Sequence, residues 1–158
     1  MLVVSGTDVD DASNYVTKSE VIDLVNPSKS CQPWADHPTG TRFAAGAFVD
    51  SQVILCGGDN PNFSNSKDCH LITPKSSEFI VSLNVGSKYS SAAEINGKVL
   101  VTGGWSNGGI KRTELISLNQ VISGPDLPYP IYHHCIIKIN NEDILSTGGS
   151  GSQAPNSG

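Results

Sequence analysis

Three apolar segments of the chain end in paired glycines and recur at nearly constant spacing. They read VILCGG (53–58), VLVTGG (99–104) and ILSTGG (144–149), so the first glycine of each pair falls 46 and then 45 residues after the previous one. A shortened copy, LVVSG, opens the sequence. A fixed period of roughly 20 to 50 residues is typical of proteins built from stacked structural repeats.

Each repeat predicts four short strands, and the second repeat places them near 43–49, 52–57, 67–72 and 78–84. Asp50-Ser51, Asn96-Gly97 and Asn140-Asn141 precede the Gly-Gly strands and predict tight hairpin turns. Glycines are expected where the chain leaves the sheet because a positive φ and a close backbone approach suit glycine best. The structural glycines of the repeat are Gly57, Gly58, Gly103, Gly104, Gly148 and Gly149.

Basic residues, with histidine counted among them, and acidic residues recur at fixed distances from these glycines. Arg42, Lys88 and His133 each stand fifteen residues before the first glycine of a pair. Acidic residues follow in the next predicted strand: Glu20, Asp68 and Glu114. These positions would either line a ligand channel or form structural pairs that tie one repeat to the next, and we favour the pairs. Replacing Arg42 by alanine would then lower stability rather than binding.

The Gly-Gly strands, the acidic position after them and Trp34 in the fourth strand of the first unit make the chain resemble the kelch-repeat family. Kelch units build the four-stranded blades of a β-propeller, so the resemblance implies an all-β fold. The units would span a partial blade at 1–41, blades at 42–87 and 88–132, and a partial blade at 133–158. They supply 13 strands in three to four blades.

A kelch propeller is expected to need five to seven blades, so these strands form an incomplete ring. An open ring exposes strand edges. We therefore expect either a fragment of a longer propeller or self-association of copies that completes the ring. The placement of Cys31, Cys56, Cys69 and Cys135 is also similar to that of invertebrate kelch-type proteins, many of them secreted.

The composition argues against two classes of partner, nucleic acids and membranes. The net charge is −5 and Lys or Arg forms no cluster, so nucleic acid is not an expected partner. No apolar stretch approaches the roughly 20 residues that cross a bilayer, and no signal peptide is visible at the start. Neither membrane insertion nor a membrane anchor is expected.

The four cysteines lack metal-binding spacing, so no metal site is predicted. A simple hairpin centred in the turn-rich loop after Gly58 would place Cys56 opposite Cys69. A disulfide and two buried thiols are both open interpretations of that pair. Asn62 begins an N-glycosylation sequon in the same loop. Together these features favour an extracellular location over a cytoplasmic one.

Tyr132-His133-His134-Cys135, with Tyr89 and Trp105, is similar to the copper site of galactose oxidase, which is also built on kelch units. The crosslinking cysteine of that enzyme would stand at Ala44, so the resemblance to its site is incomplete. We predict a noncatalytic protein-interaction module with no cofactor and an unidentified protein partner. The alternative is a galactose-oxidase-like copper enzyme or a carbohydrate-binding relative.

Binding is expected on the loops between the second and third strands and between the fourth strand and the next unit. Trp105 follows a glycine pair and is the expected anchor, with Arg42, Lys88 and His133 as further candidates. The acidic segment 8–11 is expected to be part of a solvated loop, because it lacks the pattern of a calcium loop. The loops of this surface are expected at 7–18, 59–66, 105–111 and 150–158, and at 35–41, 85–87 and 124–131.

Overall fold

The computed structural model describes residues 2–7, 15–26, 28–62 and 64–151, with side chains from residue 15 onward. Within these residues the chain forms strands and no helix, which confirms the all-β prediction. No helix is therefore available to span a membrane in the described part of the chain. The thirteen strands of these residues are β1 (Leu2–Thr7), β2 (Tyr15–Val21), β3 (Gln32–Trp34), β4 (Ala45–Val49), β5 (Gln52–Cys56), β6 (Asp68–Ile72), β7 (Ser77–Ser82), β8 (Ser91–Ile95), β9 (Lys98–Thr102), β10 (Thr113–Ser117), β11 (Gln120–Ser123), β12 (Tyr132–Lys138) and β13 (Ile144–Ser150).

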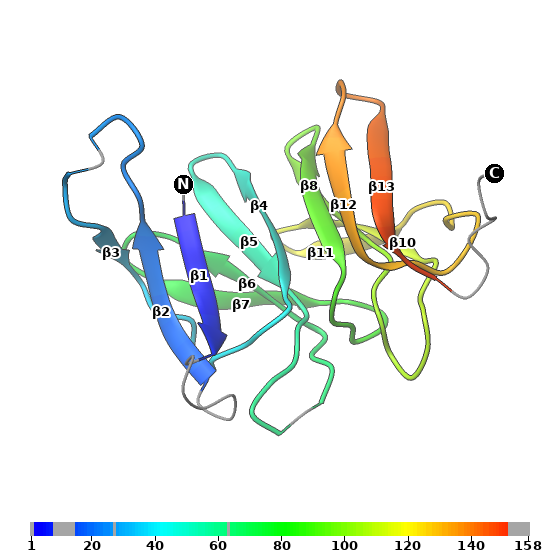
Figure 1. Cartoon of the computed structure of the whole chain (residues 1–158), viewed down its shortest axis with the longest axis horizontal. Helices are drawn as coiled ribbons and strands as arrows, with labels where there is room; N and C mark the ends of the chain where they lie inside the picture. The colour runs from blue at the N-terminus through cyan, green and yellow to red at the C-terminus, as the bar shows by residue number, and fades with distance from the viewer. Residues whose placement is uncertain (1, 8–14, 27, 63, 152–158) are drawn as a thin grey trace.

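The strands form four small antiparallel sheets that follow one another along the molecule (Figure 1). The first sheet is β1-β2-β3, the second β4-β5-β6-β7, the third β8-β9-β10-β11 and the fourth β12-β13. The strands expected in the second repeat agree with β4 to β7 within two residues at each end. The predicted division into blades remains a prediction, and Tyr132 begins β12 one residue before the predicted boundary.

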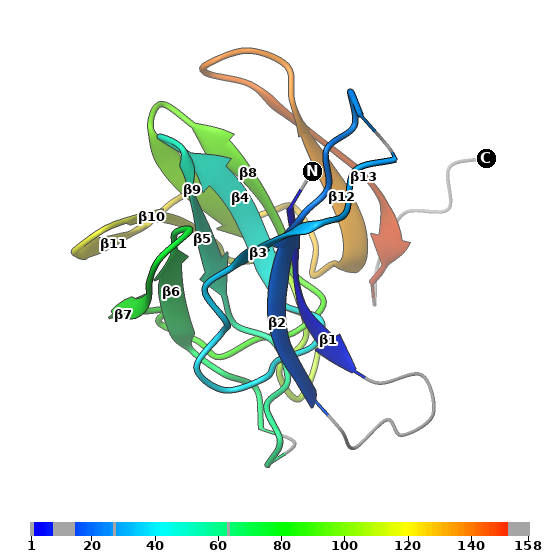
Figure 2. The ribbon, with the colours of Figure 1, turned by 90° about the vertical axis from the view of Figure 1, so that its left-hand side faces the viewer.

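The opening strands of the last three sheets lie next to one another. Contacts join β4 to β8 and β8 to β12, whereas the outer strands β7 and β11 meet at another edge. Figure 2 shows β6, β7, β10 and β11 on one side of the molecule and β4, β8 and β12 away from them. Neighbouring sheets therefore face each other, and each pair of sheets can share a core.

Two hairpin turns have the backbone that the sequence predicts. Asp50 and Ser51 have φ values of 48° and 65°, and Asn96 and Gly97 have φ values of 50° and 71°. Positive φ at both central residues is the signature of the type I′ turn, which suits the twist of paired strands. The turn before β13 is longer, because the Ile139 N–H donates to the carbonyl of Asp143.

The second glycine of each pair lies against the backbone that enters the same sheet. A Cβ on Gly58 would lie 2.8 Å from the carbonyl oxygen of Arg42, and one on Gly104 would lie 3.0 Å from that of Lys88. Their φ values are 95° and 107°. An L-residue side chain would meet both the close approach and the backbone strain, so glycine is required there.

Backbone hydrogen bonds join consecutive sheets in the same way at two junctions. The Gly58 N–H donates to the Ser87 carbonyl at 2.7 Å, and the Gly104 N–H donates to the Ile131 carbonyl at 2.8 Å. The acceptors lie in the segments that enter the third and fourth sheets. These bonds fix each sheet relative to the next, so the repeat in sequence becomes a repeat in structure.

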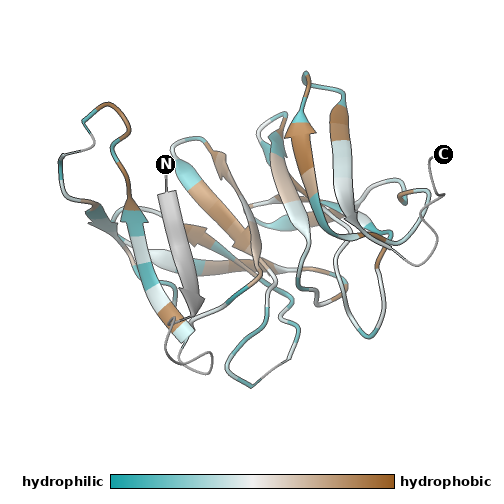
Figure 3. Ribbon diagram, in the orientation of Figure 1, coloured by the Kyte–Doolittle hydropathy of each residue, from teal (hydrophilic) through white to brown (hydrophobic). Residues whose placement is uncertain are grey.

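The main core lies between the second and third sheets. Ile54, Cys56 and Cys69 of the second sheet pack with Val99 and Ile116 of the third. The strands carry the apolar residues, whereas the connections at the lower end in Figure 3 are mostly hydrophilic. Alternate residues of β9, Val99 and Val101, and Ile116 of β10 bury one face of the third sheet against the second.

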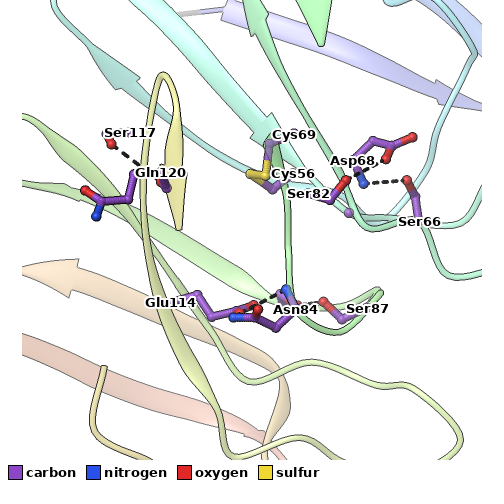
Figure 4. Close-up of a disulfide and its surroundings, with 12 residues drawn as sticks. Cys56, Ser66, Asp68, Cys69, Ser82, Asn84, Ser87, Glu114, Ser117 and Gln120 are labelled. Atoms are coloured by element: carbon purple, nitrogen blue, oxygen red, sulfur yellow. Dashed lines mark hydrogen bonds between the residues drawn. A yellow bond between two sulfur atoms is a disulfide. The ribbon is translucent and has the colours of Figure 1, made fainter. Parts of the chain in front are cut away.

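Cys56 and Cys69 form a disulfide between directly paired positions of β5 and β6, which confirms the disulfide interpretation (Figure 4). Both cysteines are buried. Cys31 and Cys135 are free and exposed. The disulfide closes the loop that leads from Gly57 to Asp68, and it anchors one connection of the candidate site described next.

Candidate functional site

The connections at the lower end of Figure 1 form the surface that we call the loop face. Bridges between Arg42 and Asp59 and between Lys88 and Trp105 show that the two kinds of connection meet there. The loop face comprises 35–44, 57–62, 64–67, 83–90, 103–112 and 124–133. Of the predicted loop 7–18, residues 8–14 lie outside the described residues, whereas Thr7 ends β1 and Tyr15 begins β2, so the predicted loop is too long at both ends. Most of the predicted loop 150–158 also lies outside the described residues.

An aromatic row crosses the loop face at the entrance to three sheets. The row consists of Phe43, Tyr89 and His133, with ring centroids 4.5 Å apart for the first pair and 3.9 Å for the second. The N–H of Tyr89 donates to the carbonyl of Phe43, and the N–H of His133 donates to that of Tyr89. Backbone and side chains thus place three rings from separate sheets side by side.

All three residues of the aromatic row have left-handed backbone. Their φ values are 60° for Phe43, 60° for Tyr89 and 55° for His133. This conformation is unfavourable for bulky side chains, and such strain is concentrated at functional sites. The inter-sheet hydrogen bonds hold the strained backbone, and the Phe43 side chain remains 44% exposed. The row is therefore a rigid aromatic surface that is open to solvent.

A buried carboxylate organises the charges beside the aromatic row. Asp59 is 1% exposed and accepts hydrogen bonds from the Nε and Nη2 of Arg42 at 3.1 and 2.9 Å. Lys88 of the next repeat places its Nζ 3.6 Å from the other carboxylate oxygen. Burial raises the pKa of the nearby Tyr15 hydroxyl above its usual value, and the Asp59 carboxylate raises it further. Asp59 thus pairs with cations from two consecutive repeats.

Trp105 occupies the position in the third repeat that Asp59 occupies in the second. Both residues follow the glycine pair and bridge to the strand-entry residue of their own sheet. Lys88 reaches back to Asp59 at the first of these junctions, and Tyr132 contacts Trp105 at the next, with ring centroids 5.0 Å apart. An ion pair and an aromatic pair therefore fill equivalent positions, and Trp105 is half-buried against Tyr132.

The predicted alignment of His133 with Arg42 and Lys88 is wrong. Ala45 pairs with Cys56 and Ser91 with Thr102, but Cys135 is the residue that pairs with Thr147. The longer turn before β13 adds one residue, so Tyr132 takes the position of Arg42 and His133 joins the aromatic row. The aromatic row itself has no recurring residue type, which is why the sequence did not reveal it.

The predicted pairing of the recurrent bases with the recurrent acids is also wrong. Arg42 and Lys88 pair with Asp59, which the sequence analysis did not single out. The backbone amide and the side-chain amide of Asn84 both donate to the Glu114 carboxylate, so Glu114 does tie the third sheet to the second (Figure 4). Glu20 is exposed on β2.

Asp68 does not share the register of Glu114. Cys69 pairs with Cys56 and Thr113 with Thr102, so the residue equivalent to Glu114 is His70. Cys69 lies two residues further from Gly57 than Thr113 lies from Gly103, so a count made from the glycines reaches a different register position in the two sheets. Asp68 is exposed at the start of β6 and accepts a hydrogen bond from the Ser82 hydroxyl at 3.3 Å.

Two imidazoles meet between the first and second sheets, beside a polar hollow of about 240 Å³ on the loop face. The rings of His37 and His70 lie 4.6 Å apart in an edge-to-face contact. His37 corresponds to Leu83 of the next junction, because the His37 N–H donates to the Thr17 carbonyl and the Leu83 N–H donates to the Lys67 carbonyl. Burial lowers the pKa of His37 to about 4, and burial also lowers that of His70.

The chain is expected to lose stability as the pH falls from about 6.5 to about 4. Between these pH values His37 is protonated in the unfolded chain, where its pKa is about 6.5, but neutral in the folded chain, where its pKa is about 4. Lowering the pH to about 4 therefore lowers the free energy of unfolding by roughly 3 kcal/mol. The variant His37→Leu, which copies Leu83, should show a shallower pH dependence in urea unfolding. Equal slopes for the two proteins would contradict this assignment.

Asn62 lies exposed at the rim of this hollow, where a glycan would project from the loop face. Its glycosylation remains a prediction. In the described residues no group of three or more His, Cys, Asp or Glu side chains is arranged to hold a metal ion. The chemistry at the centre of the loop face is a row of aromatic rings beside the buried carboxylate of Asp59, which pairs with the guanidinium of Arg42 and the ammonium of Lys88.

The chain matches no protein-family model and no curated protein. Its fold is similar to that of a solved structure described as "Structure of YjhT", with a TM-score of 0.75. The match covers 87% of this chain and 46% of the other, so the chain spans about half the length of that protein. At 13% sequence identity the similarity concerns the fold alone.

Proposed function

We propose that the chain consists of kelch-type propeller repeats and acts as a noncatalytic protein-interaction module that binds its partner on the loop face. The repeated Gly-Gly strands, the four sheets joined by equivalent backbone bonds and the recurring strand order support the kelch assignment. The aromatic row carries the functional part of the proposal. It joins side chains of Phe43, Tyr89 and His133 from three sheets on one accessible surface.

The residue types of the loop face are those that dominate protein interfaces. Trp, Tyr and Arg are enriched among the residues that contribute most to binding, because they offer large and rigid contact areas. Trp105, Tyr132 and Arg42 lie within this surface, and contacts with neighbouring side chains fix the position of each. Little side-chain entropy is then lost when a partner binds.

Replacement of Trp105 by alanine is expected to weaken partner binding by at least about tenfold, because an aromatic anchor at an interface often contributes 2 kcal/mol or more. The measurement is quantitative capture of proteins from an extract by the immobilised wild-type chain and its variants. Phe48→Ala is the matched control, because Phe48 is 58% exposed but lies on β4 toward the hairpin turn.

Proteins that the wild type and Phe48→Ala retain equally, and that Trp105→Ala loses, would support binding through the loop face. Equal retention by all three proteins would contradict it. The alternative of a galactose-oxidase-like copper enzyme rests on the contact between Tyr89 and His133 and on Trp105 beside Tyr132. It predicts stoichiometric binding of Cu(II) and oxidation of primary alcohols, and both are measured on the same preparation.

A further inference from the structure

Two connections of the third sheet contain the dipeptide Asn-Gly, and both asparagines are exposed. Asn96-Gly97 joins β8 to β9, and Asn107-Gly108 lies on the loop face between β9 and β10, just after Trp105. In such a dipeptide the main-chain nitrogen of the glycine can attack the side-chain amide carbon of the asparagine, because the glycine has no side chain to hinder the approach. The product is a succinimide ring, which water opens.

Hydrogen bonds hold both reacting groups of the first dipeptide. The Gly97 N–H donates to the Glu94 carboxylate at 2.8 Å, and the side-chain amide of Asn96 donates to the Asn141 carbonyl at 2.8 Å. Strands β8 and β9 pair immediately outside this turn and keep its type I′ backbone in place. The ring can close only after these bonds break, because attack requires the two reacting atoms to be close and aligned.

The second dipeptide has neither restraint. Among the described residues, none forms a hydrogen bond with the side chain of Asn107 or with the N–H of Gly108. The bond that closes this turn runs from the Ser106 N–H to the Gly108 carbonyl at 2.9 Å, so it leaves the Gly108 nitrogen free. A Cβ added at Gly108 would meet nothing within 4 Å, so the surrounding space is open to water. The reacting atoms can therefore approach each other without the loss of a hydrogen bond.

We propose that Asn107 is a site of spontaneous deamidation in the folded chain, whereas Asn96 is protected from it. The Gly108 nitrogen loses its proton to hydroxide and bonds to the side-chain carbon of Asn107, the carbon–nitrogen bond of the side-chain amide breaks, and ammonia leaves.

Water then adds to either carbonyl of the succinimide and yields aspartate or isoaspartate. Both products add a negative charge to the loop face. Isoaspartate also lengthens the main chain between Trp105 and Gly109, which bridge across this turn. The inference concerns the covalent chemistry of one loop, and it stands independently of the proposed function.

The test follows both dipeptides in the same chain. The folded protein is incubated in mildly alkaline buffer, and mass spectrometry of its peptides measures the conversion of each asparagine to the acid. Methylation by an isoaspartate methyltransferase identifies the isoaspartate product. We expect Asn107 to react at least about tenfold faster than Asn96, because the Gly97 N–H must first break its hydrogen bond to a charged group. In the chain unfolded by urea both dipeptides should react at similar rates.

Two variants complete the test. Glu94→Ala releases the Gly97 N–H, so Asn96 should react at least about threefold faster than in the wild type. Glu78→Ala is the matched control, because it removes an exposed carboxylate of β7 and should leave the rate at Asn96 unchanged. If Glu94→Ala does not fold, the comparison of folded and unfolded wild type decides. Equal rates at the two dipeptides of the folded chain, faster reaction at Asn96, or no reaction at Asn107 while the unfolded chain reacts would overturn the proposal.

Discussion

Replacement of Asp59 by alanine is expected to lower the free energy of unfolding by about 3 kcal/mol. The change leaves the guanidinium of Arg42 and the ammonium of Lys88 without their shared carboxylate, and breaking a buried ion pair by removal of one partner is strongly destabilising. Both cations are about one fifth exposed, so water recovers part of the loss. Urea unfolding measures the difference.

The matched control for Asp59 is Asp126→Ala. Asp126 pairs with Lys111 at 3.4 Å, but both side chains are more than half exposed. An exposed pair typically contributes less than about 1 kcal/mol. If the two variants lose the same stability, the Asp59 carboxylate does not hold Arg42 and Lys88 together on the loop face. Arg42→Ala should fall between them, because Lys88 still offers Asp59 a cation.

Removal of the disulfide by the double replacement Cys56→Ala and Cys69→Ala is expected to lower stability by about 3 kcal/mol. The bond joins cysteines 13 residues apart, and closing a loop of this size restricts the unfolded chain by an amount of that order. Both side chains also pack in the main core. Thermal or urea unfolding under oxidising conditions measures the loss.

The double variant Cys31→Ala and Cys135→Ala is the control, because these cysteines are free and exposed. It should unfold at the same urea concentration as the wild type. Thr102 and Thr113 hold the equivalent paired positions of the third sheet, so the register alone does not require a disulfide. If the wild type were no more stable than the disulfide variant, the bond would have no structural role in the chain.

The strands were predictable from sequence because their signals are local. Gly58 and Gly104 mark strand ends where a positive φ and a close carbonyl permit no side chain, and Asn96-Gly97 marks a turn that selects a few residue types. The pairing of Cys56 with Cys69 also followed from the centre of one hairpin. Such features need only the residue and its near neighbours in the chain.

The candidate site was less predictable because it depends on register and on contacts between sheets. One additional residue in the turn after Ile139 moves His133 into the aromatic row. No residue type in that turn indicates that the turn is one residue longer. Asp59 acts through Lys88 of the next repeat, a contact that arises only when two sheets pack together. His37 and His70 meet for the same reason.

The central claim is that backbone bonds between sheets hold the loop face as one pre-organised surface. Amide hydrogen exchange measured by NMR tests it at Gly58, Gly104, Tyr89 and His133, whose N–H groups donate across the junctions. We predict that all four exchange at least about a hundredfold more slowly than the exposed Asn107 of the same face. Exchange of these four amides at the rate of Asn107 would contradict the account, because the sheets would then move independently and the aromatic row would not persist.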